Sequence, residues 1–459
     1  MEALLFGPVT TLSAAIRKKE VSSVETVQAY LTRIETVNPK LNAVVALAAD
    51  AAIEQARAAD EALARGEVIG PLHGVPMTIK DSFDTANVIT TWGTPGRAGY
   101  KPKRDATVVA RLKRAGAILL GKTNTPEFTL SFETDNPVYG RTNNPYNLDR
   151  TSGGSSGGAA AIVSAGGSPF DIGSDTGGSI RLPSHFCGAA GIKPTRGRVP
   201  RTGHAVPPGS LIDALTHIGP IARYVEDLSL LLPIIAGPDE QDPFIFPVSL
   251  GDPRSVQLKG LRGTFHTDNG IQTPIPAIIK AVQASVEALV NAGIAFKEAR
   301  PPGIEQTDDL MTKLLNWDGG AWRRMLLERA GTAADQTSLF VAESQTAANG
   351  EQIVAIVDHW DQFRQNMLAF MQNYDVMITP VNAYQAIPHN TWREKVKGFS
   401  YTMIHNLTGW PGVVVRVGTA DDGLPIGVQI IAKPWKEEIA LAVAQHLETV
   451  FGGWQRPPV

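Results

Sequence analysis

The chain has few of the residues that mark several classes of protein. It contains one cysteine, Cys187, which excludes an internal disulfide. It has no apolar run of about 18 residues, the minimum for a membrane-spanning helix, and no signal peptide is evident at its start. The formal net charge is −3, without a block of basic residues. We therefore expect a cytoplasmic protein, monomer or homodimer, that binds neither nucleic acid nor membrane.

What the chain does have is the composition of a globular protein, with 43% hydrophobic and 19% charged residues in 459. Strand-like and helical segments alternate, which predicts an α/β fold with a large mixed sheet covered by helices on both faces. We expect one domain with four parts. These are N-terminal helices (1–70), a core carrying the candidate site (71–236), a helical insertion over that site (237–373), and C-terminal strands and a helix (374–459).

Two glycine-rich serine sites lie 24 residues apart in the run from Thr151 to Arg181. Ser155 stands in GGSSGG and Ser179 in DTGGS. Glycine lets a backbone turn tightly and present its N–H groups. A serine in such a turn offers both a nucleophile and donors for an oxyanion, the two requirements of acyl transfer. The alternative is a pair of glycine-rich loops with serine as filler.

A serine nucleophile needs a base. The nine histidines form no recognisable pattern near either serine; His185 follows Ser179 but completes no triad signature. Lys80 is the other candidate, because the alternation Val75-x-Met77-x-Ile79 predicts a strand that carries Lys80 inward. Burial would lower its pKa and make it a base. Local sequence alone favours an ordinary surface lysine.

The chain resembles the amidase signature hydrolases, whose Ser–cis-Ser–Lys triad needs neither histidine nor metal. The resemblance rests on HGVPMTIKD, DATVVARLKRAGAILLGKTNTPEF, the TSGGSSGG run, SDTGGSIRLPS and FCGAAGIKPTRGRVP, and returns at YDVMITP, NLTGWPGVVV and GLPIGVQII. About half of the chain is covered and the motifs come in the family's order. One departure is Ser152, where family members often have proline.

The resemblance implies a role for each matching residue. Ser179 would be the nucleophile, Ser155 the bridging serine after a cis bond from Gly154, and Lys80 the base. The backbone N–H groups of an oxyanion hole would be those of Thr176, Gly177, Gly178 and Ser179. Asp175 and Arg181 would form a buried pair that braces the turn. No cofactor and no metal are expected.

Other motif matches do not fit their context. Gly116 to Thr123 matches a phosphate-binding expression, but its interior, AILL, predicts a buried strand. Gly153-x-Ser155-x-Gly157 matches the nucleophile elbow of α/β-hydrolases, which needs an apolar strand before it, whereas Asn143 to Arg150 is polar. That interpretation would make Ser155 the nucleophile with a distant histidine. Cys187 is expected to be a buried apolar residue.

Apolar residues near the expected pocket predict a small neutral substrate: an amide, anilide, ester or carbamate. The candidate pocket residues are Met311, Leu314, Leu315, Trp317, Trp322, Tyr384, Trp392 and Phe399. One alternative is the glutaminase subunit of a tRNA-dependent amidotransferase. However, the stretch from Gly398 to His405 lacks the acidic residue expected for an ammonium group. A catalytically silent binding protein is the alternative outside enzymes.

Overall fold

The computed structural model describes residues 1–207, 213–339 and 346–459. Within these residues the strands form two sheets, one three-stranded in the order β1-β3-β2 and one eight-stranded in the order β4-β6-β5-β10-β11-β9-β7-β8. The small sheet consists of β1 (Val44–Leu47), β2 (Pro76–Lys80) and β3 (Ile118–Thr123). The large sheet consists of β4 (Phe170–Asp175), β5 (Ala190–Lys193), β6 (His217–Ala222), β7 (Arg262–Phe265), β8 (Ala295–Glu298), β9 (Val376–Pro380), β10 (Gly412–Thr419) and β11 (Pro425–Ala432).

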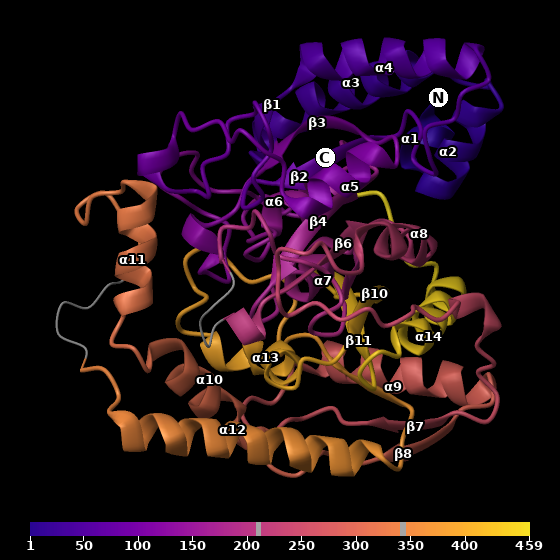
Figure 1. Cartoon of the computed structure of the whole chain (residues 1–459). Helices are drawn as coiled ribbons and strands as arrows, with labels where there is room; N and C mark the ends of the chain where they lie inside the picture. Colours follow the sequence, from indigo (N-terminus) through magenta and orange to yellow (C-terminus); the bar gives the residue numbers. More distant parts are fainter. Residues whose placement is uncertain (208–212, 340–345) are drawn as a thin grey trace.

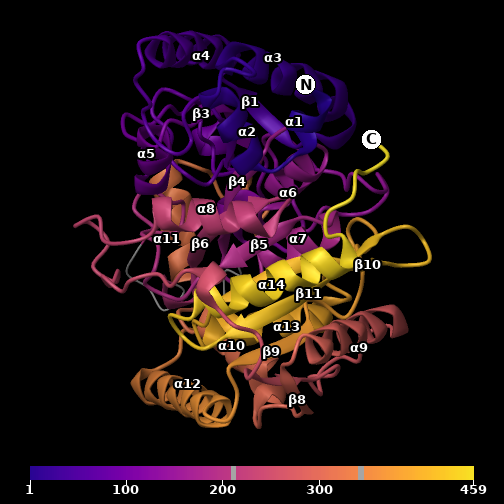
Figure 2. The same ribbon diagram turned by 90° about the vertical axis from the view of Figure 1, so that its right-hand side faces the viewer.

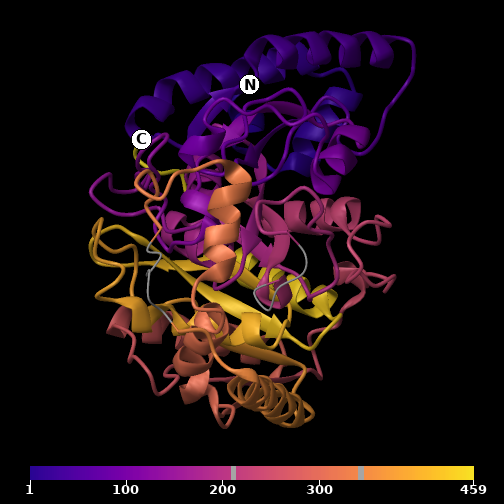
Figure 3. The same cartoon turned by 60° about the vertical axis from the view of Figure 1, so that its left-hand side comes forward.

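The N-terminal segment is helical, as expected, and lies at one end of the molecule (Figure 1). Ser22 and Glu25 form a complete capping box at the start of α3, which satisfies backbone N–H groups that a helix end leaves free. Both chain ends lie in this half of the molecule (Figures 2 and 3). The helices here are α1 (Glu2–Phe6), α2 (Val9–Arg17), α3 (Ser23–Leu41) and α4 (Ala49–Ala64).

Helices cover both faces of the large sheet. On one face α8 (Val225–Ile235), α9 (Pro276–Asn291) and α14 (Glu437–Phe451) lie side by side (Figure 2). On the other, α7 (Arg181–Cys187) packs against β10 and β11, and α6 (Gly157–Ser164) packs against α7. Because both faces are covered, β11 is buried along its whole length, and its sequence is almost entirely apolar.

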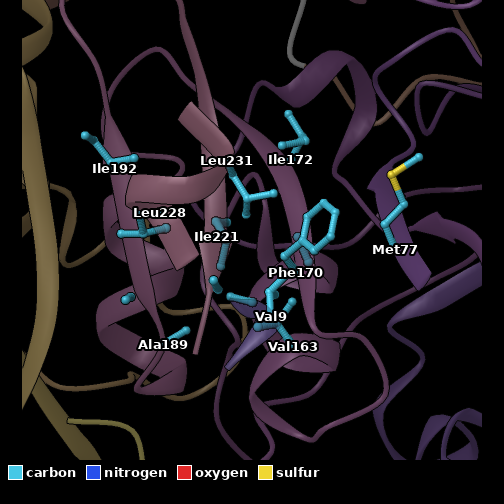
Figure 4. Packing of buried hydrophobic residues seen from close by; sticks show 14 of the residues in the cluster. Val9, Met77, Val163, Phe170, Ile172, Ala189, Ile192, Ile221, Leu228 and Leu231 are labelled. Carbon is cyan, nitrogen blue, oxygen red and sulfur yellow. The ribbon is translucent and has the colours of Figure 1, made fainter. Parts of the chain in front are cut away.

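The main hydrophobic core lies behind the strand that leads to Ser179. Phe170 and Ile172 of β4 are fully buried and pack with Ile221 of β6 and Leu228 and Leu231 of α8 (Figure 4). Since side chains of a strand alternate between its two faces, this packing fixes the direction in which β4 delivers its last residues. The loop after β4 therefore starts from a rigid base.

The segment 237–373 is not purely helical, in contrast to the expected insertion. It contributes β7 and β8 to the edge of the large sheet. Of its described helices, α10 (Thr307–Asn316), α11 (Ala321–Ala330) and α12 (Gly350–Met371) stand apart from the sheet (Figure 1). The strands escaped prediction because they are four residues long, and β8 is largely exposed and lacks an apolar alternation. The remaining helices are α5 (Thr107–Arg114), which precedes β3, and α13 (Ser400–Leu407), which precedes β10. In the described part of the chain, no helix combines the length and apolar character needed to cross a membrane.

Candidate active site

Lys80 is the last residue of β2 and is fully buried, so the surface-lysine interpretation is wrong. Its Nζ lies 2.7 Å from Ser155 Oγ, 2.9 Å from Ser156 Oγ and 3.0 Å from Ser174 Oγ. Burial lowers the pKa of Lys80 well below its ordinary value, and the charges of nearby carboxylates oppose this only in part. A buried amine among hydroxyl groups favours the neutral form, which has a lone pair to accept a proton.

Asp171 links β4, the strand that leads to Ser179, to β2, the strand that ends at Lys80. It accepts hydrogen bonds from the Lys80 backbone N–H (3.0 Å), Thr78 Oγ1 (2.6 Å) and Thr123 Oγ1 (3.0 Å). Burial raises the pKa of Asp171 to about 7. Because these bonds join β2 and β3 to β4, the position of Lys80 relative to the serines is fixed by the two sheets together.

Ser155 sits in a loop that approaches other backbone closely. The peptide bond Gly154–Ser155 is cis, as the resemblance implies. A Cβ at Gly154 would come within 2.7 Å of the backbone of Phe132 and Glu133, so only glycine fits there. The Ser156 N–H donates to the Ser179 carbonyl (3.2 Å), which holds the two serine loops together. The hydroxyl groups of Ser155 and Ser179 are not hydrogen-bonded to each other.

The loop that carries Ser179 is braced by a buried ion pair. Arg181 Nη2 lies 2.9 Å from Asp175 Oδ1, and both side chains are fully buried. Burial alone would raise the pKa of Asp175, but the guanidinium of Arg181 lowers it below the usual range. The same carboxylate accepts the Gly178 N–H at 2.8 Å. Among the described residues, the N–H groups of Gly177 and Ser179 have no hydrogen-bond partner.

The histidines and the cysteine lie outside this cluster. All nine histidines are in the described residues, and none is hydrogen-bonded to Ser155 or Ser179. His185 instead contacts the Tyr384 carbonyl and the Gly427 N–H, and burial lowers its pKa to about 4. Burial raises the pKa of the Cys187 thiol. No group of three His, Cys, Asp or Glu side chains among the described residues could hold a metal ion.

The local structure argues against both the phosphate-binding match and the nucleophile-elbow match. Gly121 and Lys122 of the phosphate-binding match lie inside β3, whose residues are all buried. Residues 143–152, before the elbow-like match, contain only isolated bridges and no strand. A nucleophile elbow depends on a strand that leads directly into the serine.

Ser179 lines a cavity of about 690 Å³, whereas Ser155 and Lys80 are not part of its lining. Thr176 and Gly177 also line this cavity. Its apolar lining includes Leu130, Phe132, Met311, Leu315, Trp322, Leu339, Trp392 and Met403. Charged side chains also line it: Glu127, Glu133, Asp135, Asp308, Arg323 and Arg393. A larger groove of about 860 Å³ lies between α8 and α14 but touches none of the three candidate catalytic residues.

The structure divides the predicted pocket residues. Trp322, Trp392, Met311 and Leu315 line the cavity, but Leu314 is buried in the core below it. Trp317 lines a separate hollow beside α12. Tyr384 and Phe399 are not among the residues that line the cavity; Phe399 stacks on the lining residue Phe132.

Phe132 is the most important residue that the sequence did not single out. Its ring stacks on Phe399 with 4.5 Å between centroids and meets Trp392 edge-on at 5.8 Å. A Cβ placed on Gly177 would lie 3.5 Å from the Phe132 ring and 3.5 Å from Met311. The side of the cavity next to Gly177 is therefore apolar and aromatic.

The arrangement agrees with comparisons to known proteins. The family model described as Amidase matches residues 25–441. The chain belongs to the amidase family. The amidase is 35% identical to fatty-acid amide hydrolase 2-B of Danio rerio, over 99% of this chain and 92% of that protein. It is 34% identical to a subunit of the glutamyl-tRNA(Gln) amidotransferase of Carboxydothermus hydrogenoformans, over 95% of this chain and 96% of that protein.

Solved structures agree with this assignment. The structure of 6-aminohexanoate cyclic dimer hydrolase with its substrate superposes on the amidase with a TM-score of 0.89, at 27% identity and 99% coverage of both chains. The protein is therefore an enzyme of the amidase signature family that acts on amides. Since hydrolases and amidotransferase subunits resemble it almost equally, the choice of substrate depends on the site itself.

Proposed function

We propose that this amidase is a free-standing hydrolase that cleaves the C–N bond of amides through an acyl-enzyme on Ser179. The observation that carries the proposal is the fully buried Lys80, whose Nζ lies 2.7 Å from Ser155 Oγ. Ser179 is the member of the set that faces the cavity. This arrangement supports Lys80 as the base, Ser155 as the proton relay and Ser179 as the nucleophile.

The proton balance follows from this order. Neutral Lys80 takes the Ser155 proton while Ser155 takes the Ser179 proton, and Ser179 Oγ attacks the carbonyl carbon. The tetrahedral intermediate expels the amine, which receives the proton back from the Lys80 ammonium through Ser155. A water molecule, deprotonated by the same route, then releases the acid from Ser179. The apo positions of the two serine hydroxyls do not argue against this relay, because catalytic hydrogen bonds often tighten only with substrate.

The oxyanion would be bound by backbone N–H groups of the loop from Thr176 to Ser179. The N–H groups of Thr176, Gly177 and Ser179 are the candidates, because none of them has a hydrogen-bond partner among the described residues. The Gly178 N–H already serves Asp175. We therefore propose the N–H groups of Thr176, Gly177 and Ser179 as the oxyanion donors. Gly178 instead stabilises the loop through its hydrogen bond to Asp175.

The apolar wall supports a small substrate with an aromatic or aliphatic group beside the scissile bond. Aryl amides and anilides fit this description, and esters and aryl carbamates share the same reacting carbonyl. We propose no cofactor and no metal for any of these reactions. A serine acyl-enzyme with a lysine base supplies both the nucleophile and the proton transfers.

The competing function is glutamine hydrolysis within an amidotransferase, favoured by the 34% identity to a subunit of such an enzyme. Glutamine carries a carboxylate and an ammonium group, which need charged partners near the nucleophile. A Cβ placed on Gly177 would meet Met311 and Phe132 first. Charged side chains do line the cavity, namely Glu127, Glu133, Asp135, Asp308, Arg323 and Arg393, but 398–405, where the family resemblance places the acidic partner of the ammonium group, contains no acidic residue. We therefore expect weak or no glutaminase activity, and the complete set of three catalytic residues argues against a silent binding protein.

The test is amine release from matched substrates: an aryl amide, its alkyl counterpart, an anilide, an aryl carbamate and glutamine. Ser179→Ala should abolish turnover of all of them. Ser285→Ala is the matched control, because Ser285 is also buried but donates to a helix carbonyl in α9. Activity should rise toward alkaline pH as Lys80 loses its proton. Glutamine turnover above that of every aryl substrate, dependent on a co-purified subunit, would instead support the amidotransferase.

A further inference from the structure

Helix α13 packs directly on the loop that carries the nucleophile, although more than 200 residues separate them in the sequence. Thr402 and Asn406 lie one turn apart on α13 and are both fully buried, so they present their side chains to the same side. Thr402 Oγ1 donates to the Gly177 carbonyl at 2.7 Å. Asn406 Nδ2 donates to the Asp175 carbonyl at 3.0 Å and to Asp175 Oδ1 at 2.8 Å.

As a result, the peptide group between Gly177 and Gly178 is held at both ends. Its carbonyl accepts from Thr402 Oγ1 and its N–H donates to Asp175 Oδ1. The carbonyl and the N–H of a trans peptide point in opposite directions within one plane. Two partners on opposite sides therefore fix the rotation of that plane, which one partner alone would leave free.

The approach of α13 is close enough to require glycine in the loop. Gly178 has a φ of +130°, a conformation that residues with a side chain rarely adopt. A Cβ at this position would lie 2.2 Å from Thr402 Oγ1. The contact between Thr402 and the loop is therefore specific to this backbone conformation, and no larger residue could replace Gly178 without moving α13.

The held peptide lies between Gly177 and Ser179, whose N–H groups have no hydrogen-bond partner among the described residues. The direction of each of these N–H groups depends on the orientation of the peptide plane next to it. Donors to an oxyanion are effective when they are oriented before the reaction. A residue that fixes the intervening plane therefore acts on both donors at once.

We propose that Thr402 is a positioning residue for the oxyanion hole. Its hydroxyl holds the Gly177 carbonyl so that the flanking N–H groups point at the developing oxyanion. This inference rests on the proposed function of Ser179. Thr402 Oγ1 also lies 2.9 Å from the Phe399 carbonyl of its own helical turn, and a hydroxyl has one proton. The competing possibility is thus an ordinary hydrogen bond within the helix.

The test compares Thr402→Val, which keeps the shape and removes the hydroxyl, with Thr402→Ser, which keeps the hydroxyl. Thr307→Val is the matched control, because Thr307 is a fully buried threonine whose hydroxyl donates to the Ile304 carbonyl outside the site. We expect Thr402→Val to lower kcat by about tenfold, less than the roughly 100-fold or greater loss seen when an oxyanion donor itself is removed. KM should change little. Thr402→Ser should recover most of the activity.

A second readout separates orientation from packing. An aryl boronic acid forms a tetrahedral adduct on a serine nucleophile, whereas a substrate analogue with a methylene in place of the carbonyl binds in the ground state only. Thr402→Val should lower the affinity for the boronic acid by the same factor as it lowers kcat. The affinity for the ground-state analogue should stay unchanged. Thr307→Val should change neither.

Unchanged kcat and boronic acid affinity in Thr402→Val would overturn the proposal and assign the hydroxyl to its helix. Equal losses of affinity for the boronic acid and the ground-state analogue, together with a lower melting temperature, would also overturn the proposal and indicate a packing role for Thr402. Ser179→Ala, assayed in parallel, separates this inference from the one it rests on. If Ser179→Ala is inactive and Thr402→Val is normal, only the role of Thr402 fails; if Ser179→Ala remains active, both fail.

Discussion

Replacing Lys80 with methionine should separate catalysis from stability in this amidase. Lys80 is fully buried, and its Nζ contacts three serine hydroxyls between 2.7 and 3.0 Å away. Methionine fills most of the space but cannot accept a proton. A general base contributes roughly 10²- to 10⁴-fold to the rate. We therefore expect Lys80→Met to lower kcat/KM about 1,000-fold, or about 4 kcal/mol.

The effect of the same change on stability should depend on pH. Burial lowers the pKa of Lys80 in the folded protein, while in the unfolded chain the pKa is about 10.4. Between these two values the unfolded state binds one more proton than the folded state. Wild-type stability therefore gains up to about 1.4 kcal/mol per pH unit from this group as pH rises through that window. Lys80→Met lacks this contribution, so its stability relative to the wild type falls as pH rises.

Urea unfolding from pH 6 to 10, with kcat/KM measured over the same range, tests both statements. Lys122→Met is the control, because burial lowers the pKa of Lys122 to about 8 and its Nζ contacts no catalytic serine. Its stability relative to the wild type should fall only above that pH, and it should keep the alkaline rise in activity. The role of Lys80 as the base is refuted if Lys80→Met has the wild-type dependence of stability on pH, or keeps more than about a tenth of the activity.

Three further changes test the site around the triad. Gly178→Ala should cost more than about 2 kcal/mol of unfolding free energy, because of the positive φ and the clash with Thr402; urea unfolding measures this, and a loss below about 0.5 kcal/mol would contradict the loop geometry. Asp175→Ala should cost about 3–5 kcal/mol, since it leaves Arg181 buried without its partner; a melting temperature equal to that of the wild type would be incompatible with the buried pair. Phe132→Ala should raise KM for an aryl amide about tenfold and leave KM for a small aliphatic amide nearly unchanged, because the ring forms the wall beside Gly177; equal changes for both substrates would argue against aromatic recognition.

Local patterns were enough to predict the strand ends and the serine loops. The alternation before Lys80 predicted a strand, and β2 does end at Lys80. The apolar run AILL predicted a strand, and β3 covers most of it. The glycines around Ser155 and Ser179 indicated tight turns because glycine alone tolerates such close approach, as Gly154 and Gly178 show. The family resemblance then supplied the role of each residue.

Contacts between distant segments could not be predicted in this way. Thr402 and Asn406 are ordinary helix residues in the sequence, and only the packing of α13 brings them to the nucleophile loop. Phe132 lies in a polar loop without periodicity, so nothing marked it as a wall of the cavity. Trp317 and Trp322 look alike in the sequence, but they line different hollows because α10 ends just before Trp317 and α11 carries Trp322.

The central claim, that Ser179 is the nucleophile and Lys80 activates it, is tested most directly by covalent labelling. The amidase and its Lys80→Ala variant would be treated with a fluorophosphonate and the modified serine mapped by mass spectrometry. We predict labelling at Ser179 in the wild type and a sharp fall in that labelling without Lys80. Labelling at Ser155 that is insensitive to Lys80 would contradict this claim and would require a histidine base instead.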